Sequence, residues 1–168
     1  MTIATHDIPH KLSSQERSLA RMHYRTMLSI TDDAPVYVYN GSFKPWQYID
    51  AVFSYIRHRL EENPKTILLC ISQDIQEAKK KAFEYHFPEA ACRYLSVPHQ
   101  EVIPLLCAGD YGLLFREPHI VNWTSRPTKL LEYQSAGLTI IHNNTIDILQ
   151  KDSTGLYAKP HTKLKETL

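Results

Sequence analysis

The sequence has little of several residue types that mark specialised protein classes. Its 168 residues include only five glycines and ten prolines, which excludes a collagen-like repeat or a linker. The three cysteines, Cys70, Cys92 and Cys107, form no CxxC pair, and an odd number argues against a disulfide framework. We therefore expect them to be small buried hydrophobic residues in a reducing compartment. The nine histidines show neither HExxH nor paired ligand spacing, so no metal site and no cofactor are expected.

An excess of one charge is missing as well. The 19 Lys and Arg residues face 18 Asp and Glu, and a formal net charge of +1 leaves no electrostatic footprint for nucleic acid or an anionic membrane. No apolar run approaches the ~18 residues of a membrane span, and residues 1–14 lack the apolar core of a secretory signal. The expected location is thus the cytoplasm. A hydrophobic content of 43% suffices for one globular domain with its own core.

What the sequence does contain is an alternation of apolar runs and helical patterns. The runs are short and continuous, as in strands buried on both faces, and cover 36–39, 66–71, 92–97, 111–115 and 138–142. Helical spacing of apolar residues follows the earlier runs, over 46–60, 74–86, 99–109 and 127–136. This order predicts an α/β fold, a Rossmann-like three-layer α/β/α domain with a mainly parallel sheet.

One further helix is expected before the first strand. Residues 12–30 are polar and partly amphipathic, and Ser13 or Ser14 is placed to begin the helix. We therefore divide the chain into residues 1–33, an N-terminal helical segment or interdomain connection, and residues 34–168, the Rossmann-like domain.

The turn after the first strand is a candidate binding loop, because ligands of parallel α/β sheets lie at the carboxyl ends of the strands. It reads Asn40-Gly41-Ser42-Phe43-Lys44 and leads into a helix. Gly41 allows backbone amides to approach a ligand closely, and Lys44 supplies a cation. On these residues alone, a plain turn is the favoured alternative.

A second candidate loop runs over 122–133. Ser125 or a neighbour is placed to cap the helix that follows, and Pro127 suits its first turn. The free amides and the dipole of such a helix start attract phosphate. Lys129 and Glu132 share a face about one helical turn, roughly 5 Å, apart. This offset suits a nucleotide along the helix, with its diphosphate at the amino end and its ribose at Glu132; a surface Lys–Glu pair is the alternative.

Arg116 and Glu117 directly follow the apolar run over 111–115, again at a carboxyl end. The guanidinium of Arg116 is suited to bidentate contact with phosphate. A solvated ion pair at a strand exit is the alternative, which the two residues alone favour slightly.

Three segments together resemble a known family. VYVYNGSFKPWQYIDAV, VPHQEVIPLLCAGDYGLLFRE and SRPTKLLEYQSAGLTII occur here in that order. They are similar to the carboxyl-terminal, nucleotide-sugar-binding half of GT-B fold retaining glycosyltransferases of the group 1 type, the large family that builds bacterial polysaccharides and lipopolysaccharides. The resemblance covers roughly residues 34–145. Its most specific part is PTKLLEYQSAGLTII, spaced after CAGDYGLL.

The resemblance implies a role for individual residues. It places Gly41 and Ser42 in the loop that faces the donor diphosphate and Val97–Val102 near the nucleotide base. Glu132 matches the second acid of the family's paired-glutamate motif, which holds the ribose hydroxyls. The segment around the diphosphate and the sugar is matched by Ser125, Pro127, Thr128 and Lys129. Such enzymes need no metal, because cationic side chains and helix termini do that work.

The sequence also departs from the family pattern. Thr124 stands where the first acid of the pair is expected, and Ser42 and Gln47 stand where Arg and Lys usually follow the glycine. Lys44 and Arg116 replace these cations only if their side chains point inward. A chain that kept the fold and lost the donor site, a non-catalytic interaction domain, is therefore the alternative. A dehydrogenase is disfavoured because no G-x-G-x-x-G follows the first strand.

The resemblance implies a function for a larger assembly. A complete GT-B enzyme has two Rossmann-like domains with catalysis between them, and this sequence has room for one. We expect a domain that binds a UDP- or GDP-linked sugar, while the acceptor-binding domain is supplied in cis or in trans. The whole would transfer a glycosyl group to an acceptor hydroxyl in polysaccharide or lipopolysaccharide biosynthesis. The chain alone is expected to be inactive, without a nucleic-acid partner, and at the inner face of the cytoplasmic membrane only through the parent enzyme.

Overall fold

The computed structural model describes residues 12–44, 47–116, 128–143 and 155–157. Their strands form one six-stranded sheet in the order β3-β2-β1-β4-β5-β6, and every neighbouring pair is parallel. The strands are β1 (Val36–Asn40), β2 (Ile67–Ile71), β3 (Cys92–Leu95), β4 (Tyr111–Leu114), β5 (Thr139–His142) and β6 (Gly155–Tyr157). This is the strand order of the doubly wound dinucleotide-binding fold. The predicted Rossmann-like parallel sheet is confirmed.

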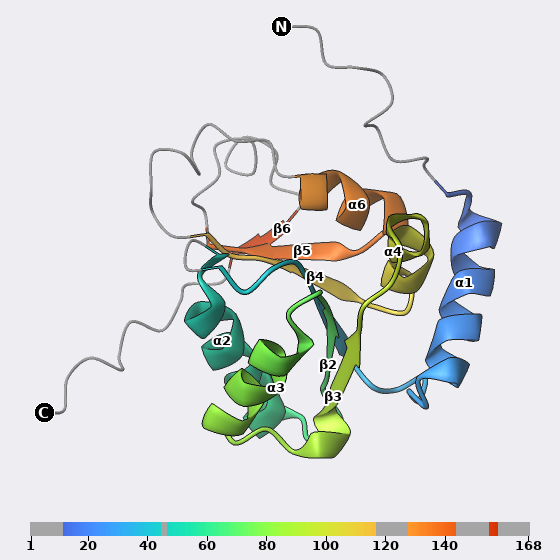
Figure 1. Cartoon of the computed structure of the whole chain (residues 1–168). Helices are drawn as coiled ribbons and strands as arrows, with labels where there is room; N and C mark the ends of the chain where they lie inside the picture. Colours follow the sequence, from blue (N-terminus) through green and yellow to red (C-terminus); the bar gives the residue numbers. More distant parts are fainter. Residues whose placement is uncertain (1–11, 45–46, 117–127, 144–154, 158–168) are drawn as a thin grey trace, which may run out of the picture.

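Helices cover both faces of the sheet (Figure 1). They are α1 (Ser14–Met27), α2 (Ile49–Glu62), α3 (Ile75–Glu84), α4 (His99–Leu106) and α6 (Thr128–Ala136), with a short 3-10 turn at Glu89–Ala91. Helices α2 and α3 lie on one face, and α1, α4 and α6 lie on the other. The predicted three layers are therefore present. None of the described helices combines the length and the apolar content that a bilayer crossing requires.

Each face of the sheet has its own apolar core. Val36 and Val38 of β1 pack toward α4 and α6, whereas Tyr37 and Tyr39 of the same strand pack toward α2. Alternate residues of a strand point to opposite faces, so a strand covered on both sides must be apolar throughout. This explains why the strands appear in the sequence as continuous apolar runs. The three cysteines are free and buried in these cores, as expected.

Some local expectations were wrong in detail. The helical pattern over 74–86 starts at Asp74, but α3 begins at Ile75, and the Asp74 side chain, in the N-cap position, makes no capping hydrogen bond. Its carboxylate instead accepts the backbone N–H of Phe43 at 2.9 Å, which ties the loop after β1 to the start of α3. Helix α2 begins only at Ile49, because Tyr48 before it has a φ of 54°, in the left-handed region. Strand β6 is too short to have been recognised as an apolar run.

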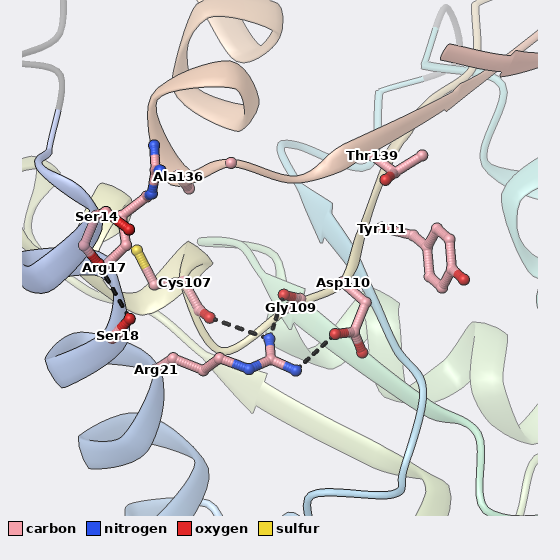
Figure 2. A pocket seen from close by; sticks show the side chains of 11 residues that line it. Ser14, Arg17, Ser18, Arg21, Cys107, Gly109, Asp110, Tyr111, Ala136 and Thr139 are labelled. Carbon is pink, nitrogen blue, oxygen red and sulfur yellow. Dashed lines mark hydrogen bonds and ion pairs between the residues drawn. The ribbon is translucent and has the colours of Figure 1, made fainter. Parts of the chain in front are cut away.

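Helix α1 is anchored to the sheet domain through one carboxylate. Asp110, just before β4, accepts Nη2 of Arg21 at 2.6 Å and Nη2 of Arg25 at 2.9 Å. Arg21 also donates to the carbonyl of Gly109 at 2.8 Å, as Figure 2 shows. The backbone N–H of Val36 reaches the same carboxylate at 2.8 Å. The amino ends of β1 and β4 are thus fastened to α1, while the proposed boundary after residue 33 stays a prediction.

Candidate functional site

The carboxyl ends of β1 and β4 form the candidate site. These two strands are neighbours in the sheet, and the chain continues from β1 to β2 on one side and from β4 to β5 on the other. The strand order reverses here, and ligands of open α/β sheets bind in the crevice outside such a switch point. Gly41 follows β1 directly, Arg116 comes two residues after β4, and Thr128 begins α6. The fold therefore brings the described parts of the three candidate loops to this edge of the sheet.

Lys129, in the first turn of α6, lies directly against Gly41. A Cβ added at Gly41 would overlap the ammonium of Lys129 and approach its Cε to 2.8 Å, so a larger residue here would displace the end of this side chain. The ammonium lies 3.4 Å from Oε1 of Gln47 and 5.9 Å from the centre of the Tyr39 ring. Gln47, which stands where the resemblance led us to expect a lysine, thus contacts Lys129 of α6.

A second cation is buried near Lys129. The Arg116 side chain is only 8% exposed, and no carboxylate among the described residues forms an ion pair with it. Burial first and the charge of Arg116 second lower the pKa of Lys129 to about 8, against the opposing charge of Glu132. Two like charges kept together away from water are unfavourable without an anion. The site is therefore electrostatically prepared for an anionic ligand.

Glu132 belongs to a buried network between α6 and β1. It is 7% exposed and accepts Nδ2 of Asn40 at 2.7 Å. The backbone N–H of Asn40 donates to the hydroxyl of Tyr133 at 3.1 Å, and this hydroxyl donates to the carbonyl of Leu113 at 3.2 Å. The ring of Tyr133 fits because β4 has Gly112 here, whose added Cβ would lie 2.6 Å from the ring. The network fixes Glu132 relative to both strands.

A cavity of about 290 Å³ opens beside this network, between the carboxyl ends of β1, β2 and β3 and the start of α4. This volume is near the lower end for ligand cavities. Glu132 does not line the cavity but is one hydrogen bond away from it, through Asn40. Gly41 lines it and also contacts Lys129, so cavity and cation pair adjoin. The full lining is Asn40, Gly41, Ser42, Ile71, Ser72, Gln73, Ser96, Val97, His99 and Val102.

The sequence-predicted residues fall into three groups. The structure brings together Gly41, Arg116, Lys129 and Glu132, and places Ser42 in the cavity wall. Lys44 and Thr128 are exposed at the edge of the site, so of the two cations expected to point inward only Arg116 is buried. Outside the described residues lie Trp46, Glu117, Thr124, Ser125 and Pro127.

Sequence reasoning missed the side chains that hold the site together. Asn40 was regarded only as part of a turn, and Tyr39 and Tyr133 only as apolar residues. The signal for Asn40 was its position, because a polar residue directly after a buried parallel strand lies at the ligand edge of the sheet. No comparable signal marked Tyr133, whose partners are backbone groups far away in the sequence.

Among the described residues, no group of three or more His, Cys, Asp or Glu side chains is placed to hold a metal ion.

This chain resembles known proteins in its fold but not in its sequence. Neither the known protein-family models nor the curated protein sequences match this chain. Among solved structures, WaaG, a glycosyltransferase involved in lipopolysaccharide biosynthesis, is similar with a TM-score of 0.66 and 17% identity. The match covers 92% of this chain and 40% of WaaG. The chain thus spans about two fifths of that structure.

Two other solved glycosyltransferase structures have a similar fold. The C-terminal domain of LpcC, a glycosyl transferase group 1 family protein from Francisella tularensis, has a TM-score of 0.61 and 12% identity over 84% of this chain and 75% of its own. Anabaena HepE, determined with UDP and glucose, has a TM-score of 0.61 and 15% identity over 90% of this chain and 40% of its own. At such identities the likeness establishes the architecture. The chain has the fold of the carboxyl-terminal half of a GT-B glycosyltransferase.

Proposed function

We propose that this chain is the donor-binding domain of a retaining glycosyltransferase, and that it binds a UDP- or GDP-linked sugar at the carboxyl ends of β1 and β4. One observation carries the proposal: the buried Arg116 and the half-buried Lys129, which lies against Gly41, are near enough for their charges to interact, and neither forms an ion pair with a described carboxylate. An anionic ligand compensates two such charges, because it replaces the hydration that burial removed. A diphosphate provides the matching negative charge in one group.

The diphosphate is assigned to the cation pair. Lys129 and Arg116 neutralise its charge, and the backbone at Gly41 and Ser42 approaches it closely, since no Cβ intervenes at Gly41. The start of α6 adds its amides and its dipole. Further contacts to the diphosphate and the sugar are assigned to Lys44, Ser125, Pro127 and Thr128.

The nucleoside is assigned to the adjoining cavity. Glu132 takes the ribose hydroxyls, since a carboxylate has lone pairs for more donors than the single Asn40 amide. Asn40, which lines the cavity, holds this carboxylate one hydrogen bond behind the cavity wall. Val97, between β3 and α4, and His99 and Val102, at the start of α4, line the part of the cavity assigned to the base.

The proposed reaction transfers the glycosyl group to an acceptor hydroxyl with retention of configuration, in polysaccharide or lipopolysaccharide biosynthesis. The bond from the anomeric carbon to the diphosphate oxygen breaks through an oxocarbenium-like transition state, while negative charge grows on the diphosphate. Arg116 and Lys129 are preorganised to stabilise that charge, which is the term that counts most in such steps and removes the need for a metal. Because the chain spans about two fifths of WaaG and HepE, the acceptor domain is supplied in cis or in trans. Alone, the chain binds donor without turnover.

Calorimetric titration of the purified chain with UDP, GDP and ADP tests the proposal. We expect micromolar to millimolar binding of UDP or GDP, and at least about tenfold weaker binding by Glu132→Ala, since a lost carboxylate leaves the ribose hydroxyls unpaired. The matched control is Glu61→Ala, which removes a surface partner of Arg57 on α2 and is expected to bind as the unchanged chain does. Equal affinity of the two variants would remove Glu132 from the site.

A non-catalytic interaction domain is the second candidate. It is favoured by internal groups that already engage the site: Gln47 contacts Lys129, and Asn40 occupies one carboxylate oxygen of Glu132. A domain that had lost its donor site would show no heat of binding with any of the three nucleotides at millimolar concentration. Absence of binding in the titration therefore selects this candidate.

A further inference from the structure

The side chain of Asn143 forms two hydrogen bonds with the main chain of Arg116. Its Oδ1 accepts the backbone N–H of Arg116 at 3.1 Å, and its Nδ2 donates to the backbone carbonyl of the same residue at 2.7 Å. The carbonyl oxygen and the NH2 group of the Asn143 amide thus both bind the backbone of Arg116. Asn is suited to this because its planar amide carries a donor and an acceptor with the geometry of a peptide group.

These two hydrogen bonds lie beyond the last paired residues of β4 and β5, so they are not part of the strand pairing. The last paired residues of β4 and β5 are Leu114 and His142, and Asn143 is the next residue after β5. Arg116 has already passed the end of β4, so no strand partner fixes its main chain there. The backbone dihedrals of a residue set the direction of its side chain. At Arg116 that side chain is the buried guanidinium beside Lys129.

We infer that Asn143 is a positioning residue that aims the guanidinium of Arg116 at the donor diphosphate; this rests on the proposed function. Asn143 touches no substrate in this assignment. It holds two backbone atoms, so the guanidinium of Arg116 meets the diphosphate in a fixed direction. The bidentate contact that arginine makes with phosphate depends on direction, and a loosely held arginine loses much of its advantage.

The test compares a ligand that has a diphosphate with one that lacks it. UDP and uridine are titrated against the unchanged chain, Asn143→Leu and the milder Asn143→Ser. We expect N143L to weaken UDP binding about tenfold, the loss of roughly one charge-assisted hydrogen bond, with uridine binding changed less than about twofold. N143S is expected to fall between N143L and the unchanged chain. The matched control is Asn63→Leu, because Asn63 also accepts a backbone N–H, from Lys65, but at the far end of α2.

A double-mutant cycle separates positioning from general support. In an Arg116→Met background, N143L is expected to cause no further loss of UDP affinity, because the group that it positions is gone. Equal losses for UDP and uridine, or an undiminished effect of N143L in that background, would show a merely structural role and overturn the inference. UDP affinity unchanged in N143L while R116M loses it would overturn the inference alone. If GDP binds and UDP does not, GDP and guanosine replace UDP and uridine in every arm of this test. A chain that binds neither UDP nor GDP overturns the proposed function, and the inference with it.

Discussion

An arginine is buried at each end of the parallel sheet, but only the arginine at the amino end forms an ion pair with a described carboxylate. At the amino end, Arg25 is 3% exposed and its guanidinium meets the carboxylate of Asp110 at 2.9 Å. At the carboxyl end, Arg116 is 8% exposed and has no carboxylate partner among the described residues. Burial lowers the pKa of both arginines; Asp110 is the main opposing influence on Arg25, whereas for Arg116 it is the phenol of Tyr39.

This difference separates a structural use of buried charge from a functional one. A buried ion pair recovers most of its desolvation cost through its partner, so Arg25 and Asp110 serve to hold α1 on the sheet. Arg116 has no such partner among the described residues, so its burial lowers the stability of the unliganded chain, and a bound anion would offset that cost. Such sites are where stability is traded for function. Substitutions that change one charge at a time test this difference.

The largest effect is expected from Asp110→Asn at the amino end. The neutral amide leaves the buried Arg25 without its countercharge and weakens the contacts to Arg21 and Val36, while the volume hardly changes. Breaking a buried pair from one side costs about 3–5 kcal/mol, and the partial exposure of Asp110 favours the lower figure. Urea unfolding followed by circular dichroism measures this loss. A change below about 1 kcal/mol would place this pair among ordinary surface contacts.

The opposite outcome is expected from Arg116→Met at the carboxyl end. Methionine removes a charge that no described carboxylate pairs and keeps an apolar chain of similar length, so the free energy of unfolding is expected to stay constant or rise by about 1 kcal/mol. UDP binding is expected to weaken about tenfold or more, since a charge-assisted contact to phosphate is lost. Unfolding and calorimetry on one preparation measure both effects. A clear loss of stability with unchanged UDP affinity would mean that Arg116 has a structural role, as Arg25 does, and no role in binding.

The fold could be predicted from the sequence to a large extent, because covering a sheet on both faces forces its strands to be apolar throughout. This requirement is local, so β1, β2 and β5 appear as runs such as Ile67–Ile71. The end of a helix is a weaker signal. Helix α2 was expected to begin at Trp46, but the left-handed conformation of Tyr48 moves its start to Ile49, and no composition rule shows such a conformation.

The candidate site could be predicted only as a set of loops. The strand-end rule identified Gly41, Arg116 and Lys129 separately, and their shared location follows from strand order, which the sequence does not state. That Lys129 lies on Gly41, and that Glu132 is held by Asn40, depends on packing between segments more than eighty residues apart in the chain. Whether these residues bind a donor stays a prediction.

A smaller effect is expected from pH at the cation pair. Burial and Arg116 lower the pKa of Lys129 from 10.5 to about 8 in the folded chain. Between pH 8 and 10.5 the unfolded chain therefore binds more protons at this lysine, so stability without ligand rises with pH across that window. UDP affinity is expected to fall over the same range, as Lys129 loses the charge that the diphosphate needs. Urea unfolding and UDP titration at pH 7, 8, 9 and 10 measure both trends.

Lys129→Met is the control for this prediction. Without a titrating group at position 129, both trends should be absent, while the contributions of tyrosines and other lysines remain in both proteins. The difference between the two proteins thus isolates Lys129. Identical pH profiles for the unchanged chain and K129M would mean that the Lys129 ammonium keeps its ordinary pKa in solution and is not held away from water beside Arg116.

The smallest effect is expected at a third kind of charge, one that is paired but exposed. Lys65 and Asp33 form an ion pair on the surface, with 63% and 58% of their side chains exposed. Water and salt screen such a pair, and holding two long side chains in one geometry costs entropy. Lys65→Met should therefore leave both the urea midpoint and UDP affinity unchanged within error. A loss comparable to that of Asp110→Asn would mean that pairing alone, rather than pairing combined with burial, accounts for the anchoring of α1, and the contrast between Arg25 and Arg116 would then need another explanation.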